Sequence, residues 1–343
     1  MGVMKEIYSL ITLLVLFTST VLAQEQSQIM PAKFVNNQIF VEVVTENEDT
    51  IRLLTDTGGG TIFITEKLSN QLELDIKEVE IKDRSMLMTS LPKLKPEYQI
   101  PFISQDFCTK KESLFNEKAD RFRDKILVMP PQPGLHEKLQ EEGVLKDGLL
   151  GQDWFATRVW TFDYKEEELI MHQSYDKDDQ SDKNVINFTF QKNGDGKHTH
   201  HMPRVQAEVA GEKIDFLFDT GATTFPNMDA LKQMNLSRSS TLGTSFITQS
   251  KFEEWREKHA DWKVIEQGER FTGAHYIEVP EVKIAGHTVG PVWFTMRPDQ
   301  AFHQNMSAMM DKKVEGALGG SLFQYFKITA NYPEEHVKFN KIY

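Results

Sequence analysis

Residues 214–221 read IDFLFDTG and residues 51–58 read IRLLTDTG, so a mostly apolar run leads into an Asp-Thr-Gly tripeptide twice. At average residue usage this tripeptide occurs by chance about once in 5,000 positions, so two copies in similar surroundings predict a common role. The apolar runs are typical of buried strands. The sequence therefore predicts that Asp56 and Asp219 are presented by equivalent tight turns, each at the end of a strand.

A second motif is repeated downstream of each tripeptide. Residues 147–155 read DGLLGQDWF and residues 315–323 read EGALGGSLF, an offset of 315 − 147 = 168. The Asp-Thr-Gly motifs are offset by 219 − 56 = 163, so the second copy carries 168 − 163 = 5 additional residues between its motifs. Two equivalent units are the simplest explanation of this internal repeat.

Each unit is expected to follow one order of elements, mostly strands with a few short helices. Apolar residues alternate before each tripeptide, which predicts strands there. These residues are Ile39, Val41 and Val43 in the first unit and Val205, Ala207 and Val209 in the second. The remaining expected elements are equivalent short helices at Glu66–Gln71 and Met228–Met234, strands at Val279–Ile284 and Val289–Met296, and second helices near His136–Glu142 and Ser307–Val314.

The length of 343 residues, with 39% hydrophobic and 26% charged, suits a large globular protein with two lobes. The predicted organisation is a signal peptide at residues 1–23, an N-terminal lobe at 24–174, a linker and polar loop at 175–197 and a C-terminal lobe at 198–343. A charged segment at Lys251–Lys263 has helical spacing of its aromatic residues, and we expect it to pack over the second lobe.

The first residues are typical of a secretory signal peptide. Lys5 supplies the positive charge, residues 7–17 the apolar stretch, and Val21-Leu22-Ala23 the small-residue cleavage site. The apolar run is shorter than the about 20 residues that a spanning helix needs, so an uncleaved anchor is the less favoured alternative. We therefore expect an exported protein, periplasmic or extracellular, with no membrane contact after cleavage.

Charge and cysteine content exclude several classes of function. The net charge is −12 and the 39 Lys and Arg residues form no cluster, which argues against nucleic acid as a partner. Cys108 is the only cysteine, so no intrachain disulfide is possible. His198, His200 and His201 could supply zinc ligands, but strand alternation would point the last two to opposite faces. An exposed loop is the favoured interpretation there, and we expect neither a metal nor a cofactor.

The two Asp-Thr-Gly turns, each with a Gly-x-Leu-Gly at 148 − 56 = 92 and 316 − 219 = 97 residues further on, resemble the aspartic peptidases of the pepsin and retropepsin type. The closing pattern is similar to the retropepsin-like aspartyl protease domains found in many bacterial proteins. The resemblance covers nearly all of the mature chain as two tandem copies. It implies an all-β fold with short helices, in which two duplicated lobes form a bilobal, pseudo-twofold β-barrel architecture.

The resemblance also implies a chemistry. Asp56 and Asp219 would form a catalytic dyad, because two close carboxylates cannot both ionise and therefore share a proton; aspartic peptidases are the standard example of this effect. Thr57 and Thr220 would hydrogen-bond across the lobes, and Gly58 and Gly221 would let backbone N–H groups approach the carboxylates. The implied function is an exported aspartic endopeptidase, monomeric through pairing of its lobes, which acts on a peptide or protein and needs no metal.

Two departures from the family pattern leave alternatives open. Gly59 and Gly60 follow the first motif where the family commonly has Ala or Ser, and we expect them to loosen that turn. Neither copy has a hydroxyl directly after its motif, which predicts a less acidic pH optimum. One alternative is a catalytically inactive binding or scaffold protein. Another is that each unit builds its own dyad by homodimerisation.

A hairpin that closes over substrate is expected between each Asp-Thr-Gly and the second helix of its unit. The candidates are Arg84–Lys95 and Gln267–Tyr276. In the second candidate, Gly268 and Gly273 would be hinges and Tyr276 a substrate contact. An ordinary surface hairpin is the alternative interpretation of both segments.

Overall fold

The computed structural model describes residues 27–81, 84–101, 125–131, 134–173, 182–236 and 241–342. The predicted signal peptide, Cys108 and residues 175–181 of the predicted linker lie outside these ranges. Within them, no helix has both the length and the apolar character needed to cross a membrane.

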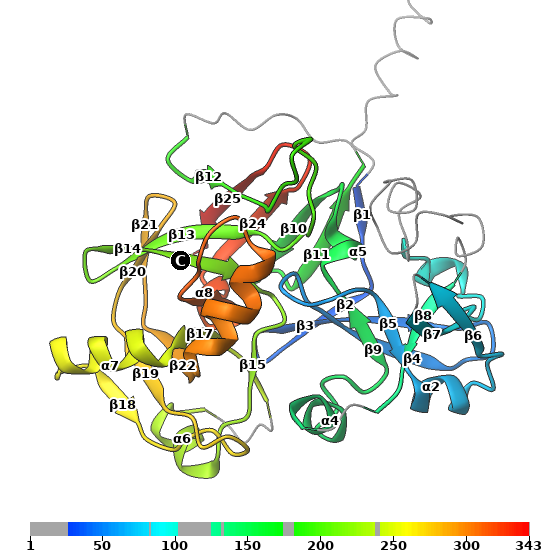
Figure 1. Cartoon of the computed structure of the whole chain (residues 1–343), viewed down its shortest axis with the longest axis horizontal. Helices are drawn as coiled ribbons and strands as arrows, with labels where there is room; N and C mark the ends of the chain where they lie inside the picture. Colours follow the sequence, from blue (N-terminus) through cyan, green and yellow to red (C-terminus); the bar gives the residue numbers. More distant parts are fainter. Residues whose placement is uncertain are drawn as a thin grey trace, which may run out of the picture.

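The chain folds into two lobes that are joined by a central sheet (Figure 1). The N-terminal lobe is built on one sheet and also contains the helices α2 (Glu66–Gln71), which contacts the strands β5 (Phe63–Thr65) and β8 (Ile126–Met129), and α4 (Leu135–Glu141). The strands of this sheet run in the order β2 (Ala32–Val35), β3 (Gln38–Val44), β4 (Thr50–Thr55), β9 (Gly148–Leu150), β5, β8, β7 (Arg84–Thr89) and β6 (Lys77–Ile81).

The C-terminal lobe repeats this plan with a larger sheet and with the helices α6 (Met228–Gln233) and α7 (Gln249–Lys258). Its strands run in the order β18 (Lys263–Ile265), β19 (Tyr276–Val279), β22 (Val292–Arg297), β17 (Ser245–Thr248), β23 (Gly316–Leu318), β14 (Glu212–Phe218), β13 (Arg204–Val209), β20 (Val282–Ile284) and β21 (His287–Val289). Helical turns at Ala301–Met306 and Ser307–Met309 precede β23.

The central sheet carries the approximate twofold symmetry of the molecule. Its strands are ordered β1 (Ser27–Ile29), β11 (Glu168–His172), β10 (Val159–Asp163), β24 (Phe326–Asn331), β25 (His336–Lys341) and β12 (Val185–Asn187). At its middle β10 and β24 pair antiparallel, and Thr161 lies opposite Thr329, its equivalent at an offset of 168. Their Oγ1 atoms are 2.9 Å apart, so the twofold axis passes between them. The predicted mostly β fold with short helices, in two duplicated lobes, is confirmed.

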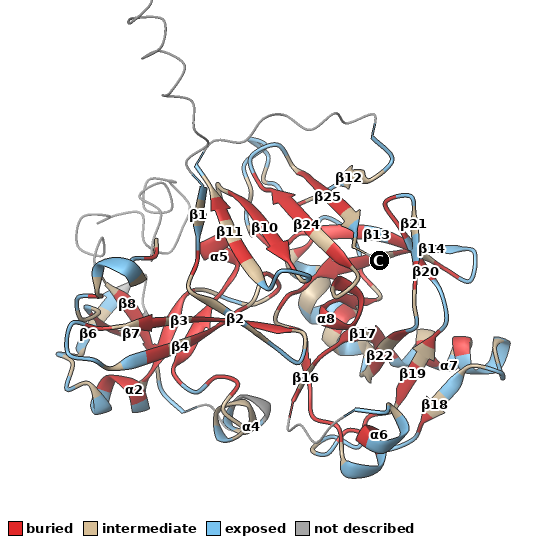
Figure 2. Cartoon of the chain, turned by 180° about the vertical axis from the view of Figure 1, so that it is seen from behind, coloured by how far each residue is buried: buried red, intermediate tan, exposed pale blue. Residues whose placement is uncertain are grey.

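Each Asp-Thr-Gly follows a strand that lies in the middle of its lobe. β4 pairs in parallel with β9, and β14 pairs in parallel with β23, so each tripeptide emerges beside a Gly-x-Leu-Gly motif. The short helices α5 (Gln152–Phe155) and α8 (Gly320–Phe323), again offset by 320 − 152 = 168, follow those motifs. Figure 2 shows that β3, β4, β10 and β24 are largely buried. The alternating apolar residues predicted before each tripeptide are all in the core.

One predicted equivalence is wrong. The helix at Met228–Gln233 exists, but the partner of α2 in the second lobe is α7, because both helices follow a strand that pairs with the Gly-x-Leu-Gly strand. Residues 61–66 read TIFITE and residues 244–249 read TSFITQ, an offset of 244 − 61 = 183. The second lobe thus has 183 − 163 = 20 additional residues after its tripeptide, which contain α6, β15 (Thr223–Thr224) and β16 (Leu242–Gly243).

Other boundaries also differ from the expectations. Part of the predicted linker, at residues 185–190, belongs to the central sheet and the core, since β12 pairs with β25 and Phe188 and Phe190 are buried. The predicted strand Val279–Ile284 is divided between β19 and β20, and Val289–Met296 is divided between β21 and β22. The charged segment is helical as predicted, and α7 buries Phe252 and Trp255 against the second lobe.

Candidate active site

Asp56 and Asp219 are brought together between the lobes. Asp219 is buried and Asp56 is partly buried. The backbone N–H of Asp56 donates to Leu150 O at 3.0 Å, and that of Asp219 donates to Leu318 O at 2.9 Å. Leu150 and Leu318 are the leucines of the two Gly-x-Leu-Gly motifs, so each motif supports the turn of its own lobe.

The two threonines form a reciprocal set of hydrogen bonds across the lobes. Thr57 Oγ1 donates to Phe218 O at 2.9 Å and accepts from the N–H of Thr220 at 3.0 Å. Thr220 Oγ1 donates to Thr55 O and accepts from the N–H of Thr57, both at 3.2 Å. Both side chains have no exposed surface. These are the hydrogen bonds that the resemblance implied, and they hold the two turns in register because buried backbone groups need a partner.

The glycines of both motifs pack against the carboxyl group of the opposite lobe. A Cβ atom on Gly58 would lie 2.7 Å from Asp219 Cγ, and one on Gly221 would collide with the Asp56 carboxyl group. In the first lobe, Gly59 also approaches this group, since a Cβ there would lie 2.5 Å from Asp56 Cγ. Glycine is therefore the residue that these three positions accept.

The first turn is supported more firmly than its two additional glycines predicted. The carbonyl of Gly60 accepts from the N–H of Gln152 at 3.0 Å, and a Cβ on Gly151 would collide with that carbonyl. The position of Gly60 itself has open space around it. A side chain at position 59 would thus collide with the Asp56 carboxyl group, whereas nothing in the structure requires glycine at position 60.

The pKa values of the two carboxyl groups are raised to different extents. Burial raises the pKa of Asp219 well above its ordinary value, and the charge of Asp56 and a hydrogen bond to Asp56 raise it further. Burial also raises the pKa of Asp56, but hydrogen bonds from Asp219 and from the backbone of Gly58 and Gly59 oppose that rise. The arrangement favours a protonated Asp219 that donates a hydrogen bond to a charged Asp56. Because the two groups interact, the protons are gained and lost by the pair as a unit.

A cleft of about 800 Å³ opens at the two carboxyl groups. Its volume is that of a site for a ligand with several side chains rather than for a small ion. Its walls are mainly apolar and come from both lobes. The N-terminal lobe contributes Leu54, Phe63, Met129, Leu139, Leu145 and Leu149, and the C-terminal lobe contributes Leu217, Thr223, Phe246, Arg297, Phe302 and Met306.

The predicted substrate contact at Tyr276 is wrong. Its side chain has no exposed surface and packs with Ala230 and Ile265, and its hydroxyl group hydrogen-bonds Thr224 Oγ1 at 2.7 Å. A Cβ on Gly268 would lie 2.7 Å from the tyrosine ring, so this glycine makes room for the ring. The position of Tyr276 on β19 turns it into the lobe and away from the cleft.

Neither candidate flap supplies a described residue to the lining of the cleft. The loop within Gln267–Tyr276 instead crosses to the other lobe, where Arg270 forms an ion pair with Glu142 at 2.7 Å. Its neighbour Phe271 packs edge-on against Phe225, with ring centroids 4.8 Å apart. This loop therefore ties the lobes together at the end of α4.

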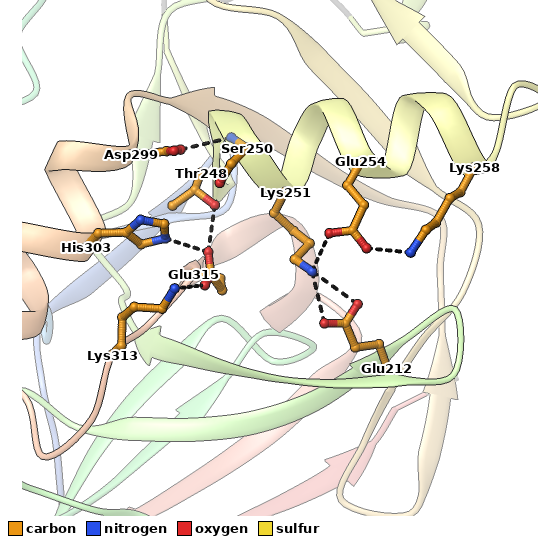
Figure 3. Close-up of polar contacts among 10 residues, drawn as sticks. All are labelled: Glu212, Thr248, Ser250, Lys251, Glu254, Lys258, Asp299, His303, Lys313 and Glu315. Carbon is orange, nitrogen blue, oxygen red and sulfur yellow. Dashed lines mark hydrogen bonds and ion pairs between the residues drawn. The ribbon is translucent and has the colours of Figure 1, made fainter.

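A polar network lies at the start of the second Gly-x-Leu-Gly motif (Figure 3). Glu315 accepts hydrogen bonds from Thr248 Oγ1 at 2.9 Å and His303 Nε2 at 2.6 Å, and Lys313 Nζ lies 2.6 Å away. Burial opposes ionisation of this carboxyl group, but the contacts with Lys313, His303 and Thr248 lower its pKa to about 2. The network anchors the strand that supports Asp219.

The three histidines are held by separate partners. His198 Nε2 lies 3.0 Å from Glu335 Oε1, His200 Nδ1 lies 3.2 Å from Gln191 Oε1, and His201 Nδ1 lies 3.4 Å from Asp153 Oδ1. No group of three or more His, Cys, Asp or Glu side chains suited to a metal ion occurs in the part of the chain that the structure describes.

The chain was compared with protein families, with curated proteins and with solved structures. No protein-family model matches the sequence, and a search of curated proteins finds no match. Among solved structures, the chain is similar to conglutin gamma, a unique basic 7S globulin from lupine seeds, with a TM-score of 0.42 and 9% sequence identity over 92% of this chain and 95% of the other.

Proposed function

We propose that this chain is an exported aspartic endopeptidase that hydrolyses peptide bonds in a single cleft between its two lobes. The observation that carries the proposal is the pair Asp56 and Asp219: two Asp-Thr-Gly turns present hydrogen-bonded carboxyl groups to one cleft, with pKa values raised to different extents. Such a pair can hold a base and an acid at the same pH.

In the proposed reaction, charged Asp56 takes a proton from a water molecule and the resulting hydroxide attacks the carbonyl carbon of the scissile bond. Protonated Asp219 gives its proton to the carbonyl oxygen, which yields a tetrahedral diol. A proton then passes to the leaving nitrogen, and the C–N bond breaks. Asp56 Oδ1 is buried without a hydrogen-bond partner among the described residues, which supports its role as the proton acceptor.

The cleft walls support a peptide or protein substrate with apolar side chains beside the scissile bond. Six apolar residues of the N-terminal lobe face this cleft, so apolar side chains would be desolvated there. One chain provides both carboxyl groups, which supports an active monomer over a homodimer that builds its own dyads. Size-exclusion chromatography combined with an activity assay tests that preference.

The test of the function is cleavage of an unbiased peptide mixture across pH by the wild type and by Asp56→Asn and Asp219→Asn. We expect each variant to lose at least about 100-fold in cleavage rate, because each removes a proton acceptor or donor. Asp195→Asn, in an exposed loop, is the matched control and should remain active. Full activity of either dyad variant would contradict the proposal.

A peptide-like transition-state mimic such as pepstatin provides a second readout. The proposed endopeptidase should bind it and be inhibited by it. A folded wild-type protein that neither binds the mimic nor cleaves any peptide would instead indicate a peptidase-like scaffold.

A further inference from the structure

Arg297 introduces a positive charge into an otherwise apolar and acidic cleft. It is the last residue of β22, and its side chain lines the cleft together with Asp219 and Thr223. Among the described residues that line this cleft, it is the only basic one. Thr223 lies two residues beyond the Gly of the second tripeptide, so Arg297 is on the wall next to the reacting carboxyl groups.

The present contacts of Arg297 use only part of its hydrogen-bonding capacity. The guanidinium lies over the ring of Phe246, 4.2 Å from its centroid. Nη1 donates to Met296 O at 3.2 Å, and Nη2 makes a long hydrogen bond to Thr223 O at 3.4 Å. A guanidinium carries five N–H donors in a planar fork. The ring of Phe246 therefore orients the guanidinium. The two hydrogen bonds to carbonyl groups use only two of its five N–H donors, so the others are available to a ligand.

No described carboxylate neutralises this charge at close range, since none of the ion pairs in the described part of the chain includes Arg297. Burial lowers its pKa from the ordinary value, although the charge of Glu269 acts in the opposite direction. Glu269 Oε2 accepts from the N–H groups of Phe271 and Thr272 at 3.2 and 2.6 Å, and Glu269 Oε1 is buried without a hydrogen-bond partner among the described residues. Arg297 is partly buried, and Glu269 does not form an ion pair with it, so a carboxylate that arrives with a ligand could make direct hydrogen bonds to the guanidinium.

We propose that Arg297 forms a subsite for a carboxylate of the substrate, supplied either by an Asp or Glu side chain or by a free C-terminus near the scissile bond. The planar fork suits bidentate binding of a carboxylate, and stacking on Phe246 holds its plane. This inference rests on the proposed endopeptidase function and adds a charge preference to a cleft that is otherwise selective for apolar groups.

The experiment compares peptides that differ only by Glu or Gln at each position around the cleaved bond. A second pair compares a free C-terminal acid with the amide, which distinguishes the two sources of the carboxylate. At one position the wild type should prefer the acid by about 10-fold to 100-fold in kcat/KM, as charge-assisted hydrogen bonds allow. Arg297→Gln should lose this preference, so its kcat/KM should fall more for the acidic peptide than for the neutral peptide.

Controls separate a binding role from a structural one. Arg256→Gln removes an exposed arginine of α7 and should keep the wild-type preference. Arg297→Lys keeps the charge but loses the fork, so an intermediate preference is expected. If thermal unfolding shows that Arg297→Gln does not fold, Arg297→Lys and the salt dependence of the wild-type preference still test the carboxylate subsite. Equal losses on the acidic and neutral peptides in folded Arg297→Gln would overturn it.

A binding measurement separates failure of this inference from failure of the proposed function. Non-cleavable peptides with a statine group and either Glu or Gln at the chosen position are titrated calorimetrically into the wild type and Arg297→Gln. Tighter binding of the Glu probe to the wild type alone supports the subsite even if no peptide is cut. Cleavage with no acid preference at any position overturns the subsite and leaves the endopeptidase function standing.

Discussion

Gly221 lies against the carboxyl group of Asp56, so closely that a Cβ atom on residue 221 would collide with it. Gly58 lies in the same way against Asp219. The turn of each lobe thus forms the wall that positions the carboxyl group of the other lobe. Neither lobe contains the complete arrangement, so substitutions at the interface between the lobes should disturb both carboxyl groups.

Gly221→Ala should therefore impair cleavage strongly. The added methyl group has to displace the Asp56 carboxyl group or separate the lobes, and overpacking of this kind costs about 1–3 kcal/mol of stability. We expect at least a 10-fold loss of kcat/KM in a steady-state assay, with a lower unfolding temperature. Gly194→Ala is the control, because a Cβ there meets open space in an exposed loop that does not line the cleft, and activity should be close to wild type. A fully active Gly221→Ala would mean that the close packing of Gly221 against the Asp56 carboxyl group is not needed for cleavage.

Thr57→Val and Thr220→Val should destabilise the pairing of the lobes. Each substitution removes a hydroxyl group that makes two buried hydrogen bonds and leaves an N–H of the other threonine without its partner. A loss of about 1–3 kcal/mol is expected for each in urea unfolding.

The double variant tests whether the two threonines act together. It should lose less than the sum of the single losses, because replacing either threonine lets the two turns move apart and weakens the hydrogen bonds of the other. Thr288→Val, at an exposed position of β21, should be near neutral. Strictly additive losses would show that the two side chains stabilise the fold independently.

The raised pKa of Asp219 predicts a specific dependence of stability on pH. A carboxyl group whose pKa is raised on folding is bound to its proton more tightly in the folded state, so its contribution to stability falls as pH rises above the ordinary value of 3.8. Asp219→Asn removes this effect. The variant should unfold at a higher temperature than the wild type at pH 7, with a smaller difference at pH 3. A gain that is equal at both pH values would argue against a raised pKa.

The same pKa shift predicts the activity profile. The dyad works when it holds one proton, and a raised pKa of Asp219 keeps that proton at higher pH. We expect the pH–rate profile to extend from mildly acidic pH toward neutrality and to fall when Asp219 loses its proton. An optimum confined to strongly acidic pH would contradict this expectation.

Glu315 shows the opposite dependence on pH. Its pKa is lowered from 4.5 to about 2 on folding, so its stabilising effect is complete above the ordinary value and is lost as pH falls toward 2. Glu315→Gln should lower stability at pH 7 by about 1–2 kcal/mol, allowing for partial exposure to solvent, and should equal the wild type near pH 2. Urea unfolding at both pH values checks this. Glu257→Gln, on the exposed face of α7, should change little at either pH.

Equivalent motifs in the sequence predicted where the carboxyl groups meet. The tripeptides and the Gly-x-Leu-Gly motifs are local patterns, and the constant offset of 168 from Asp147 to the end of the repeat matches the pairing of Thr161 with Thr329. The tripeptides do not predict that α7 is the equivalent of α2. Both helices follow a Thr-x-Phe-Ile-Thr segment, at residues 61–65 and 244–248, and the insertion that contains α6 places the second segment 20 residues further from its tripeptide. A search for that shorter repeat would have identified α7.

Tyr276 and Arg297 show where local pattern is insufficient. Tyr276 lies on a strand where one residue of difference decides between cleft and core, and packing turned it inward. Arg297 stands one residue past a predicted strand, with no motif around it. It is brought into the cleft because β22 pairs in parallel with β17, which is distant in sequence.

Local composition and repetition alone specified two β-rich lobes and two Asp-Thr-Gly turns, because strand periodicity and the glycine turns depend on neighbours in the chain. Only the tertiary structure decided which lobe surfaces face each other, which carboxyl group is favoured to hold the proton, and which charge lines the cleft. The physical reason is that burial and contact between residues 163 positions apart, such as Thr57 and Thr220, set these properties.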